Sequence, residues 1–192
     1  WYVNLGIGIP TLIADHIPPE REVVIHSENG VLGVGPAPET HKANPWLVNA
    51  STHRVSIRPG GSFVHHADSF AMVRGGHLDL CVLGGFQVAE NGDLANWAHS
   101  ATEAGRQIGG AMDLAVGARR VWVVMEHTTR DGQARILERC TYPLTAGHCV
   151  TRVYTSLAVL DVTPQGFVAI DMIPGLSFEA LQAQSGARLH RA

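Results

Sequence analysis

The chain has 192 residues, 45% of them apolar, which fits one domain that buries its own core and excludes a disordered chain. Charged residues make up only 16%, against about 25% in a typical soluble domain, so we expect a partner chain to cover part of the surface. The balance of 14 basic and 17 acidic residues argues against nucleic acid or an anionic membrane as a partner, and no apolar run approaches the roughly 20 residues that a membrane-spanning helix needs.

Short apolar runs that end in glycine predict the strands of a buried sheet. Residues 23–25 run into Asn29-Gly30, residues 78–83 run into Gly84-Gly85, and residues 121–125 form a third, partly β-branched run. Continuous apolar runs of this length are typical of strands that are buried on both faces. Two further runs, residues 159–162 and 167–170, flank Pro164-Gln165-Gly166 and predict a β-hairpin.

Helices are predicted between these strands. The four candidates are residues 10–17, 68–74, 111–118 and 178–185. Pro10 suits the first turn of the first helix, and Asp68 and Ser177 are the expected N-caps of the second and the fourth. Glycines directly after the second and the fourth candidates agree with helix ends at those points.

This alternation of strands and helices predicts an α/β fold: an open, mostly parallel sheet with flanking helices, in one domain over residues 1–192 with an added β-hairpin. Ligands of such sheets bind at the carboxyl ends of the strands, where the glycine pairs lie. The chain opens at Trp1, without a methionine and close to a glycine-rich motif, so we expect a short segment to precede it. The three scattered cysteines suit a reducing cytosol, so we expect a cytoplasmic protein.

Glu28 is the first candidate for chemistry, because it follows a predicted strand and directly precedes the Asn29-Gly30 turn. A carboxylate at such a strand end is exposed at the top of the sheet, yet flanked by walls of low dielectric constant. It can act there as a base, an acid or a nucleophile. The alternative is a structural glutamate that caps a loop or pairs with an arginine.

Two glycine-rich turns are candidates for anion binding. The first lies in NLGIGIP at residues 4–10, which has a GxG pattern but lacks the third glycine of a dinucleotide-binding fingerprint. The second is Gly109-Gly110, ahead of a predicted helix. Backbone N–H groups in such turns can hold an anion or a developing oxyanion. The alternative is that each is only a tight turn that enters a helix.

The cysteines and histidines do not predict a metal site. Cys81, Cys140 and Cys149 form no CxxC pair and are too scattered for a disulfide framework, so we expect three mostly buried thiols. The adjacent His65 and His66 would point to opposite faces of an extended segment and would not easily share a metal.

Six sequence blocks resemble, in order and spacing, the β subunits of family I CoA-transferases, and the resemblance extends over nearly the whole chain. The blocks are NLGIGIP at residues 4–10, SENGVLGVG at 27–35, RGGHLD at 74–79, GDLANW at 92–97, GGAMDL at 109–114 and CTYPLT at 140–145. SENG alone would be only suggestive, whereas six ordered blocks are highly specific.

The resemblance implies a CoA-transferase that works through a covalent enzyme–CoA intermediate. In this family the SENG glutamate, here Glu28, attacks the acyl-CoA thioester to give an anhydride, and the released CoA thiolate then forms a glutamyl-CoA thioester. A second carboxylic acid reverses these steps in ping-pong order. By the same resemblance, the oxyanion and CoA-binding region includes Asn4, Asn96, Gly109 and Gly110. We expect no metal, and no cofactor other than coenzyme A as a substrate.

The resemblance also implies a separate α subunit of similar fold, which completes the active site with a GGF…GxP motif for CoA. Gly84-Gly85-Phe86 is present here, but no GxP follows it in residues 88–93, so this chain is not expected to be the α subunit. We expect an α₂β₂ heterotetramer, because 192 residues is too short for the relatives that fuse both halves.

The expected substrates are succinyl-CoA and a 3-oxoacid, with 3-oxoadipate favoured over acetoacetate and short-chain fatty acids. Three features favour 3-oxoadipate: His26 ahead of SENG, HHADSF at residues 65–70, and residues 98–108, which lack the IPGK stretch of acetoacetate-type subunits. Because that cationic stretch is absent, the resemblance assigns no residue here to the CoA phosphates.

Two other classes of function are the alternatives to a CoA-transferase. A sugar-phosphate isomerase with Glu28 as its base would need a phosphate site with a lysine nearby, and the only lysine, Lys42, lies in a polar loop. A non-catalytic binding or scaffold subunit is the other alternative, and the intact SENG argues against it.

Overall fold

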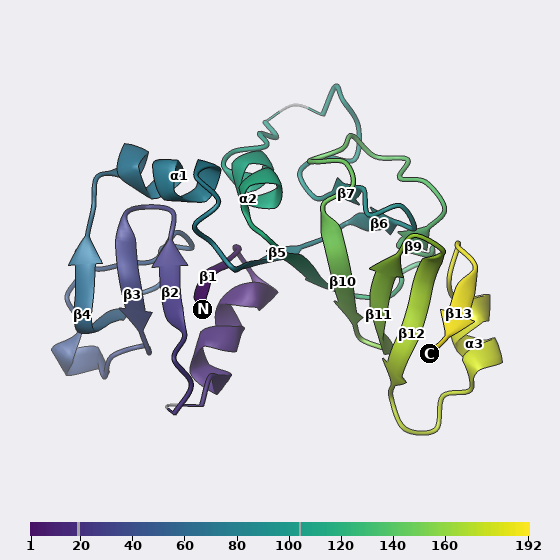
Figure 1. Ribbon diagram of the computed structural model, residues 1–192, viewed down its shortest axis with the longest axis horizontal. Helices are drawn as coiled ribbons and strands as arrows, with labels where there is room; N and C mark the ends of the chain where they lie inside the picture. The colour runs from purple at the N-terminus through teal and green to yellow at the C-terminus, as the bar shows by residue number, and fades with distance from the viewer. Residues whose placement is uncertain (19, 104) are drawn as a thin grey trace.

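A ten-stranded mixed sheet runs through the chain, of which the computed structural model describes residues 1–18, 20–103 and 105–192 (Figure 1). Its strands lie side by side in the order β13-β12-β11-β10-β8-β5-β1-β2-β3-β4. Their bounds are β1 Tyr2–Leu5, β2 Val24–Ser27, β3 Val31–Gly35, β4 Ser56–Phe63, β5 Leu80–Gly84, β8 Val121–Met125, β10 Val150–Thr155, β11 Ala158–Thr163, β12 Gly166–Met172 and β13 Leu189–Arg191. A smaller sheet has the order β7-β6-β9, with β6 Gln87–Ala89, β7 Leu94–Ala95 and β9 Ile136–Leu137.

Three α-helices and two 3₁₀ helices complete the described part of the chain. They are α1 His66–Arg74, α2 Ala111–Gly117, α3 Phe178–Ala183, and the 3₁₀ helices η1 Ile9–His16 and η2 Thr40–Lys42. Figure 1 shows α1 and α2 beside each other, with α1 above β3 and β2 and α2 above β5 in the middle of the large sheet. Within the described ranges, no helix has the length and apolar character needed to cross a bilayer.

The five central strands, β10, β8, β5, β1 and β2, are parallel. Antiparallel pairs extend the sheet on both flanks, and the edge strand β13 is parallel to its neighbour β12. Val3 on β1 lies opposite Ile25 on β2 and Leu80 on β5. The open, mostly parallel sheet is therefore confirmed, and so is the predicted hairpin, which β11 and β12 form around Gly166 at φ 103°. Because the central strands are parallel, the carboxyl ends of β1, β5 and β8 meet at one edge.

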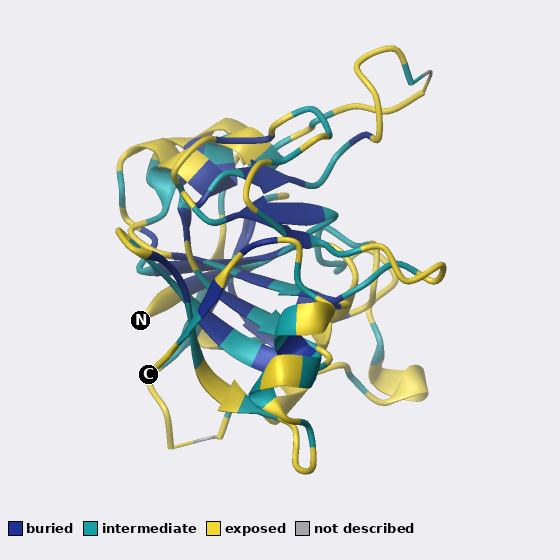
Figure 2. Cartoon of the chain, turned by 90° about the vertical axis from the view of Figure 1, so that its right-hand side faces the viewer, coloured by how far each residue is buried: buried dark blue, intermediate teal, exposed yellow. Residues whose placement is uncertain are grey.

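Apolar side chains cover both faces of the sheet and form two cores. On one face, Cys81, Leu83 and Val123 pack with side chains of α1 and α2. On the other face, Val82 packs with Ile13 of η1. Figure 2 shows the buried positions gathered in the strands, while the exposed ones lie mainly in helices and loops.

Burial along β8 differs from the prediction of a strand covered on both faces. Val121, Val123 and Met125 are buried, whereas Trp122 and Val124 are only half-buried. The short η1 covers less of their face than α1 and α2 cover of the other. The continuous apolar run is thus consistent with the strand, but it does not report how completely each face is covered.

The predicted α-helix at residues 10–17 is instead the 3₁₀ helix η1. Thr11 N–H donates to the carbonyl oxygen of Gly8, three residues earlier, and Gly8 has no side chain with which to cap the segment. The N-cap prediction for Asp68 is also wrong. Helix α1 begins two residues earlier, at His66, because the ring Nδ1 of His65 accepts the N–H of Ala67 at 3.1 Å.

The other helix predictions hold to within two residues. α2 ends at Gly117 rather than residue 118, and α3 ends at Ala183 rather than residue 185. Ser177 is the N-cap of α3, as predicted, and its Oγ accepts the N–H of Ala180 at 3.1 Å. Terminal differences of this size are ordinary for helix ends.

His127 joins the end of the parallel core to the C-terminal part of the chain. Its side chain is 1% exposed, with Nδ1 2.9 Å from Thr155 Oγ1 and Nε2 2.9 Å from Ser185 Oγ. Burial lowers the pKa of His127 from 6.5 to about 4, because a charged imidazolium would lose its hydration here. The native state therefore holds this ring neutral at pH 7.

We predict that acid weakens the fold partly through His127. Its pKa is lower in the folded state than in the unfolded state, so its contribution to stability is complete above about pH 6.5 and is lost as the pH falls toward 4. Burial also lowers the pKa of His26, which adds to the same trend. Denaturant unfolding between pH 7 and 4 should show a shallower loss for His127→Gln than for the wild type. An equal slope in both proteins would contradict the assignment, and His53→Gln, at an exposed position, is the control.

Candidate active site

Glu28 lies in the tight turn that joins β2 to β3. Ser27 on β2 pairs with Val31 on β3, and Gly30 N–H donates to Ser27 O at 3.0 Å to close the turn. Gly30 has φ 105°, and a Cβ there would come within 2.3 Å of Val64 O, so only glycine fits. The turn therefore depends on the glycine of SENG.

The two polar neighbours of Glu28 hold the turn to the preceding loop. Ser27 Oγ accepts the N–H of Ala50 at 3.0 Å, and Asn29 Nδ2 donates to Val48 O at 2.8 Å. In the part of the chain that the structure describes, no hydrogen bond or ion pair engages the Glu28 carboxylate. Three residues of SENG thus fix the backbone and leave the fourth side chain available. The alternative of a glutamate paired with an arginine has no support.

Gly110, at the start of α2, lies against the Glu28 carboxylate. A Cβ at Gly110 would be 2.8 Å from Glu28 Oε2 and 2.6 Å from Phe70 Cζ of α1. Residues 28 and 110, far apart in the sequence, are therefore neighbours because one of them has no side chain. This contact places the turn at Gly109-Gly110 beside the Glu28 carboxylate.

Burial raises the pKa of Glu28 above its ordinary value. The nearby imidazole of His66 opposes that shift, and the carboxylate of Asp113 adds to it. Asp113 itself is held by Arg74, with Nε and Nη2 at 2.7 and 3.1 Å from its two oxygens. The carboxylate of Glu28 is thus less hydrated than one on an open surface, which favours reaction with an electrophile.

A cavity of about 760 Å³ opens at the carboxyl ends of β1, β5 and β8, and it is large enough for a sizeable organic ligand. All five residues that the sequence assigned to the site line it: Asn4, Glu28, Asn96, Gly109 and Gly110. The cavity wall also includes residues that sequence reasoning missed, among them the charged Arg106, Glu126 and Arg135. Lys42, in contrast, pairs with Glu39 on exposed η2 and lies outside the cavity wall.

Asn4 is 2% exposed, and its amide is engaged by two neighbouring strands. Its Nδ2 lies 3.0 Å from Nδ1 of His26 and 3.2 Å from His26 O, and its Oδ1 accepts the thiol of Cys81 at 3.8 Å. The other ring nitrogen of His26 lies 2.9 Å from Ser69 Oγ on α1. This buried network (Ser69, His26, Asn4 and Cys81) ties α1 to β2, β1 and β5 directly below the turn that carries Glu28.

The other predicted residues of the site have distinct settings. Asn96 bridges two segments, since its Nδ2 donates to Gly84 O at 3.0 Å and its Oδ1 accepts the hydroxyl of Thr145 at 2.6 Å. In the GxG turn after Asn4, the N–H of Gly6 is bonded to Val82 O at 2.8 Å, so it is not free to bind an anion. Gly109 has φ 55°, which turns the chain into α2.

No group of three or more histidine, cysteine, aspartate or glutamate side chains that could hold a metal ion occurs among the described residues. Cys81 is fully buried, whereas Cys140 and Cys149 are half-buried, and all three are free thiols. The chemistry that the cavity offers through its own side chains is that of two carboxylates (Glu28 and Glu126), two arginines and amide groups.

The comparisons with known proteins agree with this geometry. Residues 1–184 match the family model for coenzyme A transferase. The chain is 53% identical to the B subunit of 3-oxoadipate CoA-transferase from Acinetobacter baylyi, over 98% of this chain and 87% of that protein. It is 43% identical to the beta subunit of acetate CoA-transferase from Escherichia coli, over 99% of this chain and 86% of that one. Among solved structures, its fold resembles the acyl-CoA transferase YdiF of Escherichia coli O157:H7, with a TM-score of 0.75 at 17% identity; the match covers all of this chain and 38% of that longer one.

We predict that Gly110→Ala destabilises the protein by about 1–3 kcal/mol, the usual cost of overpacking a tight contact. The new methyl group would overlap the ring of Phe70 and the carboxylate of Glu28. Gly84→Ala is a matched control, because Gly84 lines the same cavity but the nearest atom to an added Cβ, Ile7 O, is 3.9 Å away. Denaturant unfolding should separate the two variants. Equal stability would show that Gly110 and Glu28 lie farther apart than they do in this structure.

Proposed function

Because the chain belongs to the coenzyme A transferase family, we propose that it is the subunit that supplies the nucleophile for CoA transfer, and that this nucleophile is Glu28. One observation carries the proposal: the Glu28 carboxylate has no described partner, and it lies against Gly110 in the wall of the 760 Å³ cavity. A glutamate that is fixed by its backbone but free at its carboxylate is suited to attack a bound carbonyl.

The proposed reaction exchanges one carboxylate for another on CoA. Glu28 Oε attacks the thioester carbonyl of an acyl-CoA, the C–S bond breaks, and a glutamyl–acyl anhydride and CoA thiolate result. The thiolate attacks the glutamyl carbonyl, which releases the first acid and leaves a glutamyl-CoA thioester. A second carboxylate then reverses both steps and leaves as its CoA ester. No net proton, electron or water is consumed, so exclusion of water from the cavity protects the intermediates.

Each of these steps passes through a tetrahedral oxyanion, which needs hydrogen-bond donors. Gly110 is the proposed supplier of one backbone donor, because it is the residue in contact with the Glu28 carboxylate. Asn4 is proposed to define the floor of the site, where its amide is held by His26. Asn96 is proposed to hold Gly84 in place at the cavity wall, because its side-chain amide donates a hydrogen bond to the carbonyl oxygen of Gly84.

We favour succinyl-CoA and 3-oxoadipate as the substrates. The support is the 53% identity to a protein named for 3-oxoadipate, compared with 43% for the relative named for acetate. A rat mitochondrial relative named succinyl-CoA:3-ketoacid coenzyme A transferase 2A, of which this chain spans 36%, is 44% identical. Acetoacetate and short-chain acids are the alternative substrates, and assays with each acid separate them.

We also propose that an α subunit completes the active site, in an α₂β₂ assembly and in the cytoplasm. The Acinetobacter and Escherichia relatives are each named as one subunit of a larger enzyme, which supports a partner chain. Ile7 and Ile9, which line the cavity, are 67% and 50% exposed, and the adjacent Leu12 is 58% exposed. An apolar rim of this kind beside a cavity is typical of a surface that another chain covers.

We predict that Glu28→Ala lowers kcat at least a hundredfold while the protein still folds and assembles, because Glu28 lies in a turn rather than in either core. Glu28→Asp should also be severely impaired, since a side chain shorter by one methylene misplaces the attacking oxygen by about an ångström. Transfer from succinyl-CoA is the assay, and Glu22→Ala, at an exposed position in the same segment, is the control. In the wild type, borohydride reduction after incubation with acyl-CoA should trap the thioester at residue 28. Retention of more than about a hundredth of the wild-type kcat in Glu28→Ala would contradict the mechanism.

We predict that the chain alone lacks transfer activity and gains it when it is produced together with an α subunit that carries GGF…GxP. The isolated chain would leave the apolar rim of Ile7, Ile9 and Leu12 uncovered, so it should also associate or precipitate. Size-exclusion chromatography and the succinyl-CoA assay test both points. A monomer with full activity would contradict the need for a partner.

A further inference from the structure

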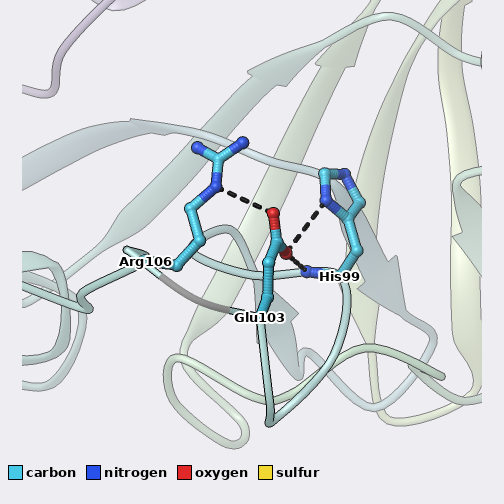
Figure 3. Close-up of polar contacts among 3 residues, drawn as sticks. All are labelled: His99, Glu103 and Arg106. Atoms are coloured by element: carbon cyan, nitrogen blue, oxygen red, sulfur yellow. Dashed lines mark hydrogen bonds and ion pairs between the residues drawn. The ribbon is translucent and has the colours of Figure 1, made fainter.

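The loop that leads into Gly109-Gly110 holds an arginine in a fixed position. Arg106 Nε donates to Glu103 Oε1 at 2.9 Å, and Glu103 Oε2 accepts the backbone N–H of His99 at 2.7 Å. The ring Nδ1 of His99 lies 3.3 Å from the same oxygen. Figure 3 shows both carboxylate oxygens of Glu103 turned toward these two residues. We call His99, Glu103 and Arg106 the anchoring trio.

The anchoring trio is itself fixed to the cavity wall. The His99 ring stacks on Phe86, with centroids 4.8 Å apart and an interplanar angle of 8°, and Tyr142 meets it edge-on at 5.1 Å. Phe86 lines the cavity. The hydrogen bond from the His99 N–H, followed by that from Arg106, lowers the pKa of Glu103 below its usual value. The carboxylate therefore stays ionised and remains paired with Arg106.

The arrangement leaves the outer edge of the Arg106 guanidinium available. Only Nε is engaged by Glu103, and among the described residues no partner is found for Nη1 or Nη2. The Arg106 side chain is 50% exposed and lines the cavity. A guanidinium has five N–H donors in a planar fork, and two parallel donors match the two oxygens of a carboxylate. An exposed ion pair adds little to stability, so the pair with Glu103 serves to orient Arg106.

Arg106 lines the same cavity as Glu28, and a short stretch of chain connects it to the glycine beside that carboxylate. It precedes Gly110 by four residues, which places their Cα atoms within about 14 Å, and Gly110 lies against Glu28. The other arginine of the cavity wall, Arg135, immediately precedes β9 of the small sheet, and Glu126 lines the wall as well. Of the two arginines, Arg106 is the one that lies a few residues before Gly110, the residue in contact with Glu28.

We propose that Arg106 binds the second, distal carboxylate of a dicarboxylic acyl group whose thioester carbonyl faces Glu28, and thereby makes the site selective for dicarboxylic acids. Succinyl and 3-oxoadipyl groups carry such a carboxylate, whereas acetyl, butyryl and acetoacetyl groups do not. The inference rests on the proposed function, because it assigns the acyl group of that reaction to this cavity.

Two donors that share the same CoA test the proposal. Succinyl-CoA and butyryl-CoA have acyl chains of four carbons and differ in the distal carboxylate, so any contact with the CoA phosphates cancels in their ratio. The assembled enzyme is assayed for kcat/KM with each donor. Arg106→Gln should lower the succinyl-to-butyryl ratio by about 10-fold to 100-fold, the effect of one lost charged hydrogen-bond pair. Glu103→Gln, which weakens the anchor but keeps the guanidinium, should lower the ratio less.

The outcomes separate the possible roles of Arg106. An equal fall for both donors would mean that Arg106 binds a CoA phosphate, and an unchanged ratio would mean that it binds neither group; both overturn the proposal. If selectivity is lost in Arg135→Gln but not in Arg106→Gln, Arg135 binds the distal carboxylate, which also overturns the proposal. Borohydride trapping distinguishes failure of the proposed function: if wild-type enzyme traps no CoA thioester with either donor, the transferase mechanism itself fails. A trapped thioester with unaltered selectivity overturns only the role of Arg106.

Discussion

The close contact between α1 and α2 is the constraint on which the site depends. Along this contact, two glycines of the second helix region meet side chains or backbone of the first. A Cβ at Gly110 would be 2.6 Å from Phe70 Cζ, and one at Gly117 would be 2.4 Å from Val73 O. Between them, Arg74 and Asp113 form a two-point ion pair. The glycines at the two ends of α2 let the helices approach closely, and the ion pair between Arg74 and Asp113 links them. This packing determines how near Gly110 comes to Glu28.

The buried polar network beneath the turn supplies the complementary constraint. Ser69 on α1 is linked through His26 to Asn4, so the helix that presents Phe70 is fixed to the strand that leads into Glu28. Removal of one partner from such a network leaves a buried donor or acceptor unsatisfied, which costs more than the net value of the bond. The distance between Glu28 and α2 therefore follows from two sets of contacts, one apolar and one polar.

The residues that the sequence named for the site all line one cavity, but their contacts with one another could not be predicted. Glu28 was singled out because it lies between a predicted strand and a glycine turn within the SENG block, and Gly110 because it lies in another of the ordered blocks. The contact between the two was not predictable, because it depends on the packing of α1 against α2. The anchoring trio was missed because a loop without periodicity does not indicate that Glu103 bonds to His99 and Arg106. The strand β4 was missed because Pro59, Gly60 and Gly61 interrupt its pattern, and its edge position tolerates them.

Burial keeps the three cysteine thiols of the protein unreactive at neutral pH. Burial raises the pKa of Cys81 and brings the pKa of Cys140 and Cys149 to about 11. At pH 7, a thiol with such a pKa is ionised in roughly one molecule in ten thousand. Acyl groups activated on a carboxylate react with thiolates, and the chain keeps its three thiols protonated. In the proposed mechanism, an acyl group activated on Glu28 would therefore not be captured by these thiols, which are protonated and do not belong to the described cavity wall.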